Sequence, residues 1–271
     1  MGLFGSSTLL DWLETYTFPV ESRFGSPPDP KTGHQTQTDP KDAPLLAQQI
    51  YDQVISRTLS HGTTCASYYA TNHVPATNAL SSLCHTRGQR AFIGRACMDN
   101  PKFCVDYYHD FSAEDSIVAT RQTIEYIHTL DPEGNLVKPI VTPRFAPSCT
   151  RLALQNLGEL AASYSPPLHV QTHISENVNE LALVKELFPE ADSYAAVYDK
   201  YKLLTPRTIL AHAVHLSADE RALIRAREAK ISHCPASNSA LGSGICPVRT
   251  LLDEGITVGL GTDVSGGYSP S

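Results

Sequence analysis

Three apolar, strand-like segments of this 271-residue chain each end in a side chain that can bind a metal ion. His173 closes the first segment and is followed three residues later by Glu176, while His212 closes the second segment and Asp263 the third. A neutral imidazole can bind zinc, and a carboxylate can either bind zinc or move protons. Two histidines and an aspartate on three strand ends therefore predict a mononuclear zinc site for hydrolysis, with Glu176 as its proton carrier.

Each of these signals also has an ordinary structural interpretation. His173 with Glu176 is equally compatible with a surface histidine beside a loop glutamate, and His212 with a hydrogen-bonded core histidine. The glycine-rich run before Asp263 suggests a phosphate-binding loop, but it lacks the GK[ST] ending of a P-loop and the third glycine of a dinucleotide fingerprint. The combination of all three strand ends is what favours a metal site.

Short apolar runs alternate with longer helical stretches along the chain, which is typical of parallel βα units and predicts an α/β fold. Barrel enzymes place their active sites at the carboxyl ends of such strands. Strands are expected at residues 63–70, 89–98, 137–145, 168–176, 208–216, 229–234 and 257–263. Helices are expected at residues 9–15, 45–60, 113–129, 151–164, 179–187, 218–226 and 248–254.

These seven strands are one fewer than a closed parallel barrel requires, and an unpaired edge strand exposes hydrogen-bonding groups. We therefore expect a (β/α)8 TIM-like barrel that is incomplete, lacking its first strand and its last helix, and that forms one domain over residues 1–271. Residues 25–44 contain five prolines and few apolar side chains, which predicts a mobile surface loop.

Composition excludes several classes of function. The net charge is −7 and the basic residues form no runs, so the chain has no electrostatic footprint for nucleic acid. No apolar stretch approaches the roughly 20 residues that a membrane helix needs. The seven cysteines are odd in number and never spaced as CxxC, which is typical of reduced thiols in a cytoplasmic protein.

The order of the ligand types resembles the amidohydrolase superfamily, in which strands five, six and eight supply a histidine, a histidine and an aspartate. Several short motifs narrow the resemblance to the guanine deaminase family within it, over essentially the whole chain. These motifs are Trp-Leu at 12–13, Tyr-Thr-Phe-Pro at 16–19, Val-Thr-Pro-Arg-Phe at 141–145, His-Ile-Ser-Glu at 173–176, His-Cys-Pro at 233–235, Ser-Asn at 237–238 and Gly-Leu-Gly-Thr-Asp-Val at 259–264.

The resemblance implies a role for each residue of the metal site. His173 and Asp263 match zinc ligands, and His212 matches a histidine that completes the metal site, orients its water or contacts the substrate. Glu176 matches the proton shuttle, so Glu176, Asp263 and His212 are the expected catalytic residues. The implied reaction is attack of water on C2 of guanine, with Asp263 accepting the proton of the water. Glu176 would protonate the ring nitrogen and deliver a proton to the departing ammonia, which gives xanthine.

The resemblance also implies how the substrate binds. Arg144 and Phe145 match the pair that receives the base, since a guanidinium can donate to its O6 and N7 edge and a ring can stack on it. His173, Glu176 and Asp263 would face the same base. Without the resemblance, Arg144 would be interpreted as a salt-bridge partner at a strand end. The implied partners are guanine, water and, as is common in the family, a second copy of the chain.

The sequence departs from the family at one point. Amidohydrolases open with an HxH pair that supplies two zinc ligands, and none of the 11 histidines here forms such a pair. We therefore expect weak zinc binding and little activity for this chain alone. Two alternatives stay open: a non-catalytic relative that binds a purine or a partner, and an amidohydrolase that deaminates another heterocycle, for which Arg144 and Phe145 would have to face elsewhere.

Overall fold

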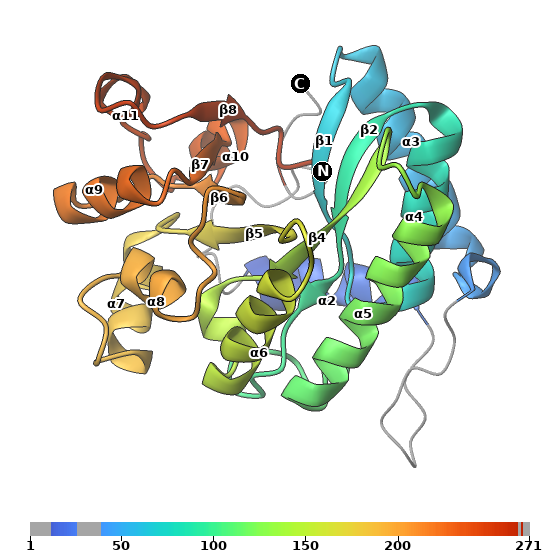
Figure 1. Ribbon diagram of the computed structural model, residues 1–271, viewed down its shortest axis with the longest axis horizontal. Helices are drawn as coiled ribbons and strands as arrows, with labels where there is room; N and C mark the ends of the chain where they lie inside the picture. Colours follow the sequence, from blue (N-terminus) through green and yellow to red (C-terminus); the bar gives the residue numbers. More distant parts are fainter. Residues whose placement is uncertain (1–11, 26–38, 265–266, 268–271) are drawn as a thin grey trace. The chain divides into compact units, whose positions relative to one another are not determined.

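The structure is a computed structural model that describes residues 12–25, 39–264 and 267. The chain divides into two compact units (Figure 1). The N-terminal unit is Leu13–Thr142, and the C-terminal unit consists mainly of Pro143–Pro270. The expectation of one domain over the whole chain stays a prediction.

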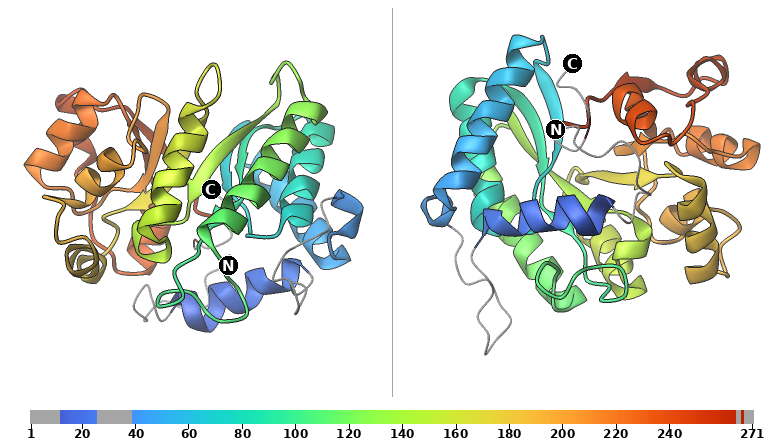
Figure 2. Two further views of the ribbon diagram at one scale, coloured as in Figure 1. Left: turned by 60° about the horizontal axis from the view of Figure 1, so that its bottom comes forward. Right: turned by 180° about the vertical axis from the view of Figure 1, so that it is seen from behind.

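The N-terminal unit is built on three parallel strands, with β2 between β1 and β4. Helices α3, α4 and α5 pack side by side in that order, and α4 also contacts β2 (Figure 2). Local sequence sets the helix ends: Gly88 closes α4 in the left-handed region at φ 71°, and the Ser112 hydroxyl caps α5. The elements are η1 (Leu13–Thr17, a π-helix), α2 (Phe18–Glu21), η2 (Ser22–Phe24), η3 (Pro40–Asp42), α3 (Leu45–Ser60), β1 (Cys65–Tyr69), α4 (Val74–Arg87), β2 (Arg90–Gly94), β3 (Ala96–Cys97), α5 (Ala113–Leu130) and β4 (Val137–Pro143).

The C-terminal unit holds four parallel strands in chain order, from β5 through β6 and β7 to β8. Side chains of Thr150, Asn177, Ser193 and Ser217 cap four of its helices. The elements are η4 (Ala146–Ser148), α6 (Arg151–Ala162), β5 (His169–Ile174), α7 (Val178–Leu187), α8 (Tyr194–Lys200), β6 (Thr208–His212), α9 (Ala218–Ala226), β7 (Lys230–His233), α10 (Pro235–Ala240), α11 (Val248–Asp253) and β8 (Val258–Leu260).

All seven predicted strands are present, with ends a few residues shorter than expected. The strand predicted at 89–98 is interrupted at Arg95 and divides into β2 and β3. Helices α4, α8 and α10 were not predicted. Within the predicted loop at 25–44, residues 40–42 form the 3-10 helix η3, and residues 26–38 lie outside the described residues. The predicted helix at 9–15 also lies partly outside them, and Leu13–Thr17 is a π-helix.

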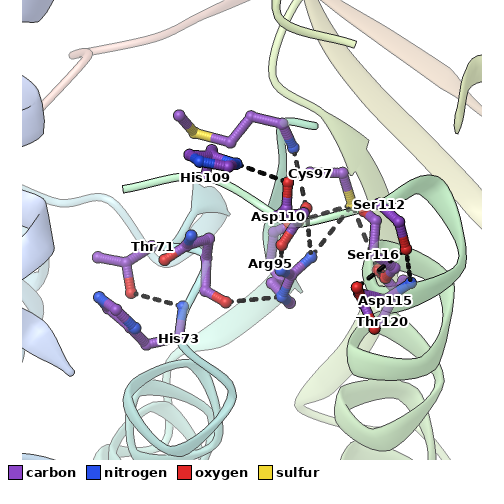
Figure 3. Close-up of polar contacts among 12 residues, drawn as sticks. Thr71, His73, Arg95, Cys97, His109, Asp110, Ser112, Asp115, Ser116 and Thr120 are labelled. Carbon is purple, nitrogen blue, oxygen red and sulfur yellow. Dashed lines mark hydrogen bonds and ion pairs between the residues drawn. The ribbon is translucent and has the colours of Figure 1, made fainter. Parts of the chain in front are cut away.

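A buried ion pair explains the interruption between β2 and β3 (Figure 3). The guanidinium of Arg95 forms an ion pair with Asp110, and its Nε donates to the carbonyl of Asn72 at 2.7 Å. Asp110 also accepts from the backbone N–H of Met98 at 3.1 Å. Loss of one partner from such a pair leaves an uncompensated buried charge, which typically costs about 3–5 kcal/mol. The pair therefore ties the end of β1 to the segment that leads into α5.

His73 gives the N-terminal unit a predictable pH dependence. Burial first, and then the charge of Arg95, lowers the pKa of His73 to about 4. The unfolded chain takes up this proton near pH 6.5, so the folded state should lose about 2 kcal/mol as the pH falls from 7.5 to 5. Urea titrations at both pH values should show a shallower dependence for His73→Gln. The exposed His61, changed to Gln, is the control and should leave the slope unchanged. Equal slopes for wild type and His73→Gln would contradict the prediction.

Gly158 allows a close backbone approach inside the C-terminal unit. A Cβ at this position would lie 1.9 Å from the carbonyl oxygen of Tyr201. Alanine is normally the better helix former by about 1 kcal/mol. Here we expect Gly158→Ala to destabilise the protein by about 1–3 kcal/mol, measured as a lower urea midpoint. Gln155→Ala, at an exposed position of the same helix, should stay within about 0.5 kcal/mol of wild type. A urea midpoint at or above that of wild type for Gly158→Ala would contradict the prediction, because it would mean that the backbone at Tyr201 moves aside at no cost in stability.

Candidate functional site

The predicted site residues lie at the carboxyl ends of the strands of the C-terminal unit. His173 is the last residue but one of β5, and Glu176 follows two residues after that strand. His212 is the last residue of β6, and Asp263 lies three residues beyond β8. Neighbouring parallel strands present their carboxyl ends at one edge of the sheet, and Ile174 pairs in register with His212. The expectation from strand order is therefore met in the backbone.

Left-handed backbone conformations mark this same edge. Ser175, His212, Ala213 and Asp263 have φ values of 50°, 73°, 54° and 54°. An L-residue adopts this region at a cost of about 1–2 kcal/mol. Hydrogen bonds hold two of the strand ends against each other: the N–H of Ala213 donates to Ile174 and that of Val214 to Ser175. The chain thus turns sharply at the strand ends that carry the candidate site residues. Unusual backbone conformations of this kind are frequent at functional sites.

Glu176 and His212 form a buried pair. Oε2 of Glu176 lies 3.4 Å from Nε2 of His212, and both side chains are almost fully buried. Burial raises the pKa of Glu176 to about 7, with Asp263 and Glu180 adding to this effect and His212 opposing it. Burial opposes protonation of His212, but the carboxylates of Glu176 and Asp263 raise its pKa above the ordinary value. Near neutral pH, a single proton can therefore move to or from Glu176.

His173 is held as a neutral imidazole beside this pair. Its ring stacks on that of His212, with centroids 5.3 Å apart and an interplanar angle of 20°. Burial, followed by the charges of His212 and Arg144, lowers the pKa of His173 to about 3. Nδ1 of His173 lies 2.6 Å from the carbonyl oxygen of Arg144, so this nitrogen carries the proton and Nε2 keeps its lone pair. That tautomer is the form of histidine that binds metals.

Three further side chains contact the candidate residues, and all come from α10 and the turn after it. Oδ1 of Asn238 lies 2.8 Å from Nδ1 of His212, so it accepts the ring proton. The Ser237 hydroxyl donates to Asp263 at 2.7 Å, and the Ser243 hydroxyl to Glu176 at 3.4 Å. Ser237 and Asn238 belong to one of the family motifs in the sequence, but no role was predicted for either residue. The signal was available, because the pair follows the end of β7 by only four and five residues and so lies near the same edge of the sheet.

Arg144 and Phe145 follow directly after β4, at the start of the C-terminal unit. Phe145 is 3% exposed and Arg144 is 9% exposed, so neither is a surface residue. The carbonyl of Arg144 also accepts the backbone N–H of His173 at 3.3 Å. The structure therefore brings the backbone of Arg144 against His173. Contact of either side chain with a base stays a prediction.

The donor set partly fits a metal ion. His173 holds its proton on Nδ1 and keeps Nε2 for coordination, and neutral imidazole is a good zinc ligand, whereas Nε2 of His212 lies 3.4 Å from Glu176. In the part of the chain that the structure describes, no three His, Cys, Asp or Glu side chains are grouped closely enough to hold a metal ion. The ligand set His173, His212 and Asp263 thus stays a prediction.

Among the described helices, none is long and apolar enough to cross a membrane.

Comparison with known proteins places the chain in a family. The model of the amidohydrolase family matches residues 1–271, and the chain belongs to this family. It is 54% identical over 263 residues to a "Probable guanine deaminase" of Schizosaccharomyces pombe, covering 97% of this chain and 46% of that protein. It is 41% identical over 263 residues to a guanine deaminase of Homo sapiens, covering 97% of this chain and 53% of that protein.

A solved structure supports the same assignment. The guanine deaminase from C. acetobutylicum, with guanine bound in its active site, has a TM-score of 0.87 and 36% identity, covering 100% of this chain and 59% of that chain. The predicted α/β fold of the amidohydrolase barrel type is therefore confirmed. The chain spans about half the length of the curated relatives that it matches.

Proposed function

We propose that the protein containing this chain hydrolyses the amino group of guanine, giving xanthine and ammonia. The observation that carries the proposal is the buried contact of 3.4 Å between Glu176 and His212, with the pKa of Glu176 raised to about 7 by burial. A carboxyl group that gains and loses a proton near neutral pH is suited to general acid–base chemistry. The similarity to guanine deaminases over 97% of the chain supports guanine as the substrate.

Substrate recognition falls to the residues around β4 and β5. The guanidinium of Arg144 donates to the O6 and N7 edge of the purine, and the ring of Phe145 offers a face for stacking. His173, Glu176 and Asp263 face the end of the base that carries the amino group. Burial of Phe145 and Arg144 supports this role, because a buried guanidinium is desolvated and binds a polar edge more strongly.

Proton transfer is divided between two carboxylates. As the oxygen of water bonds to C2 of guanine, Asp263 accepts a proton from it, and Glu176 protonates the adjacent ring nitrogen. Glu176, now ionised, takes the proton of the new C2 hydroxyl group and passes it to N2, so that the C2–N2 bond breaks, C2 becomes a carbonyl and the nitrogen leaves as ammonia. The proton held by Asp263 then returns to Glu176, which restores both carboxyl groups. The hydroxyl of Ser237 orients Asp263, and Asn238 holds His212 with its Nε2 toward Glu176.

Zinc is the cofactor that suits these donors. His173, His212 and Asp263 would hold it: His173 has Nε2 available, Asp263 is a hard anionic ligand, and His212 would bind once its Nε2, which faces Glu176, has lost its proton. Zinc supplies Lewis-acid chemistry, which makes water a nucleophile at neutral pH. The pairing of His212 with Glu176 favours a second role for His212, in which it orients the attacking water. A cytoplasmic location and a homodimer remain predictions.

The first test removes the proton carrier. We expect Glu176→Gln to lower kcat for guanine by about 10²- to 10⁴-fold, because glutamine keeps the shape but cannot transfer a proton. Ammonia release and xanthine formation measure this in the protein that contains the chain. Glu186→Gln, at an exposed position on α7, is the matched control and should have wild-type kinetics. Xanthine formation at the wild-type rate by Glu176→Gln would exclude the proposed role.

The second test concerns zinc in the 271-residue chain by itself. The sequence has no HxH pair, so at most three protein ligands are present. We expect substoichiometric zinc after dialysis and little guanine turnover, with His173→Ala reducing zinc further and the exposed His61→Ala having no effect. Metal analysis and calorimetric titration with zinc measure this. One zinc per chain together with robust turnover would contradict the expectation.

A further inference from the structure

The C-terminal unit contains a buried chain of hydrogen bonds that contacts β5. None of its side chains has a role in the proposed reaction. The chain runs from Tyr198 through Tyr194 to Glu180, and all three side chains are buried. Tyr194 and Tyr198 lie on successive turns of α8, with their rings stacked at a centroid distance of 5.3 Å. Glu180 is on α7, which contacts both α8 and η4. Together with Thr172, these residues are called the Tyr198 network below.

The hydroxyl of Tyr198 has four polar neighbours. The backbone N–H of Ala146 donates to it at 3.0 Å, and the hydroxyl of Thr172 at 2.9 Å. Tyr198 in turn donates toward the carbonyl of His173 at 2.8 Å and toward the hydroxyl of Tyr194 at 3.2 Å. A phenol has one proton and two lone pairs, so the two donors fill its acceptor capacity and its single proton is shared between the carbonyl of His173 and the hydroxyl of Tyr194.

Tyr194 and Glu180 extend the hydrogen-bond chain to the backbone of Glu176. Its hydroxyl donates to Oε1 of Glu180 at 2.9 Å. The other oxygen of Glu180 accepts the backbone N–H of Glu176 at 2.9 Å and that of Asn177 at 3.4 Å. Glu180 is also the N3 residue of the capping box of α7, which by itself would explain only the contact to Asn177. The additional contact to Glu176 links the tyrosines to the active-site edge.

The network therefore reaches each side of the candidate site. Ala146 directly follows the Arg144–Phe145 pair, His173 carries the candidate metal ligand, and Glu176 is the candidate acid and base. Every polar atom of the Tyr198 and Glu180 side chains has a partner, and a fully satisfied buried network holds its members in one arrangement. These contacts are backbone contacts, so the network places the ends of β4 and β5 and not individual side chains.

We propose that Tyr198 is a positioning residue that sets the Arg144–Phe145 segment against β5, while Tyr194 and Glu180 set the position of Glu176. This inference rests on the proposed function for its kinetic consequences. Loss of the Tyr198 hydroxyl frees the segment that receives the base and the strand that carries His173, so both binding and turnover suffer. Loss of the Tyr194 hydroxyl disturbs the support of Glu176, so turnover suffers and binding does not.

Phenylalanine substitutions test this without removing the packed rings. In the protein that contains this chain, we expect Tyr198→Phe to raise KM for guanine about tenfold and to lower kcat by about 10- to 100-fold. Tyr194→Phe should lower kcat by about tenfold with KM unchanged. Tyr201→Phe, one turn further along, removes a hydroxyl outside the network and should match wild type. A variant with reduced stability alone would lose active protein but keep its KM.

A second measurement does not depend on guanine turnover. In the structure, the Nδ1 proton of His173 faces the carbonyl of Arg144, and the nitrogen and proton NMR signals of this histidine report that contact. Tyr198→Phe should shift these signals and speed exchange of the proton with solvent, whereas Tyr201→Phe should not. If wild type does not deaminate guanine but the signals shift, the proposed function fails and the positioning role stands. If guanine is deaminated and Tyr198→Phe changes neither KM, kcat nor the signals, the positioning role is overturned.

Discussion

The candidate site depends on the burial of one carboxyl group. Glu176 is almost fully buried beside His212, and a carboxylate in that environment must either be paired or stay protonated. The surrounding polar groups are arranged accordingly. Ser243 donates to Glu176 and Asn238 fixes the ring proton of His212, while the left-handed turns at the strand ends bring the pair together. The same burial that destabilises the charged form gives the group a proton to transfer near neutral pH.

Much of the fold follows from patterns that are local in sequence. Apolar runs with β-branched residues located all seven principal strands, because a parallel strand buried on both faces must be apolar. Residue type at the strand ends then located His173, His212 and Asp263 on one edge of a sheet. Helix α8 was missed because its seven residues are too few for a clear helical period. The division of 89–98 was missed because the Arg95–Asp110 pair joins residues 15 positions apart.

The site was less predictable than the fold, for a physical reason. Residue type indicates which side chains can take part in a reaction, but not which other residues fix their positions. Asn238, Ser237 and Tyr198 act through contacts to residues 25 or more positions away in the sequence, and no periodicity encodes such contacts. The pKa of Glu176 is equally a property of the folded surroundings. Sequence therefore named the candidate reacting groups, and the structure added the groups that contact them.

The left-handed backbone at His212 and Asp263 has a consequence for how this site can change over evolutionary time. Glycine adopts that conformation at little cost, so substitution by glycine there would relax the backbone while it deletes the imidazole or the carboxylate. Backbone stability therefore favours glycine at the same two positions where the proposed reaction needs an imidazole and a carboxylate. A lineage released from the catalytic requirement would be expected to accumulate glycine there early, so these positions are a sensitive record of whether a homologue still turns over a substrate.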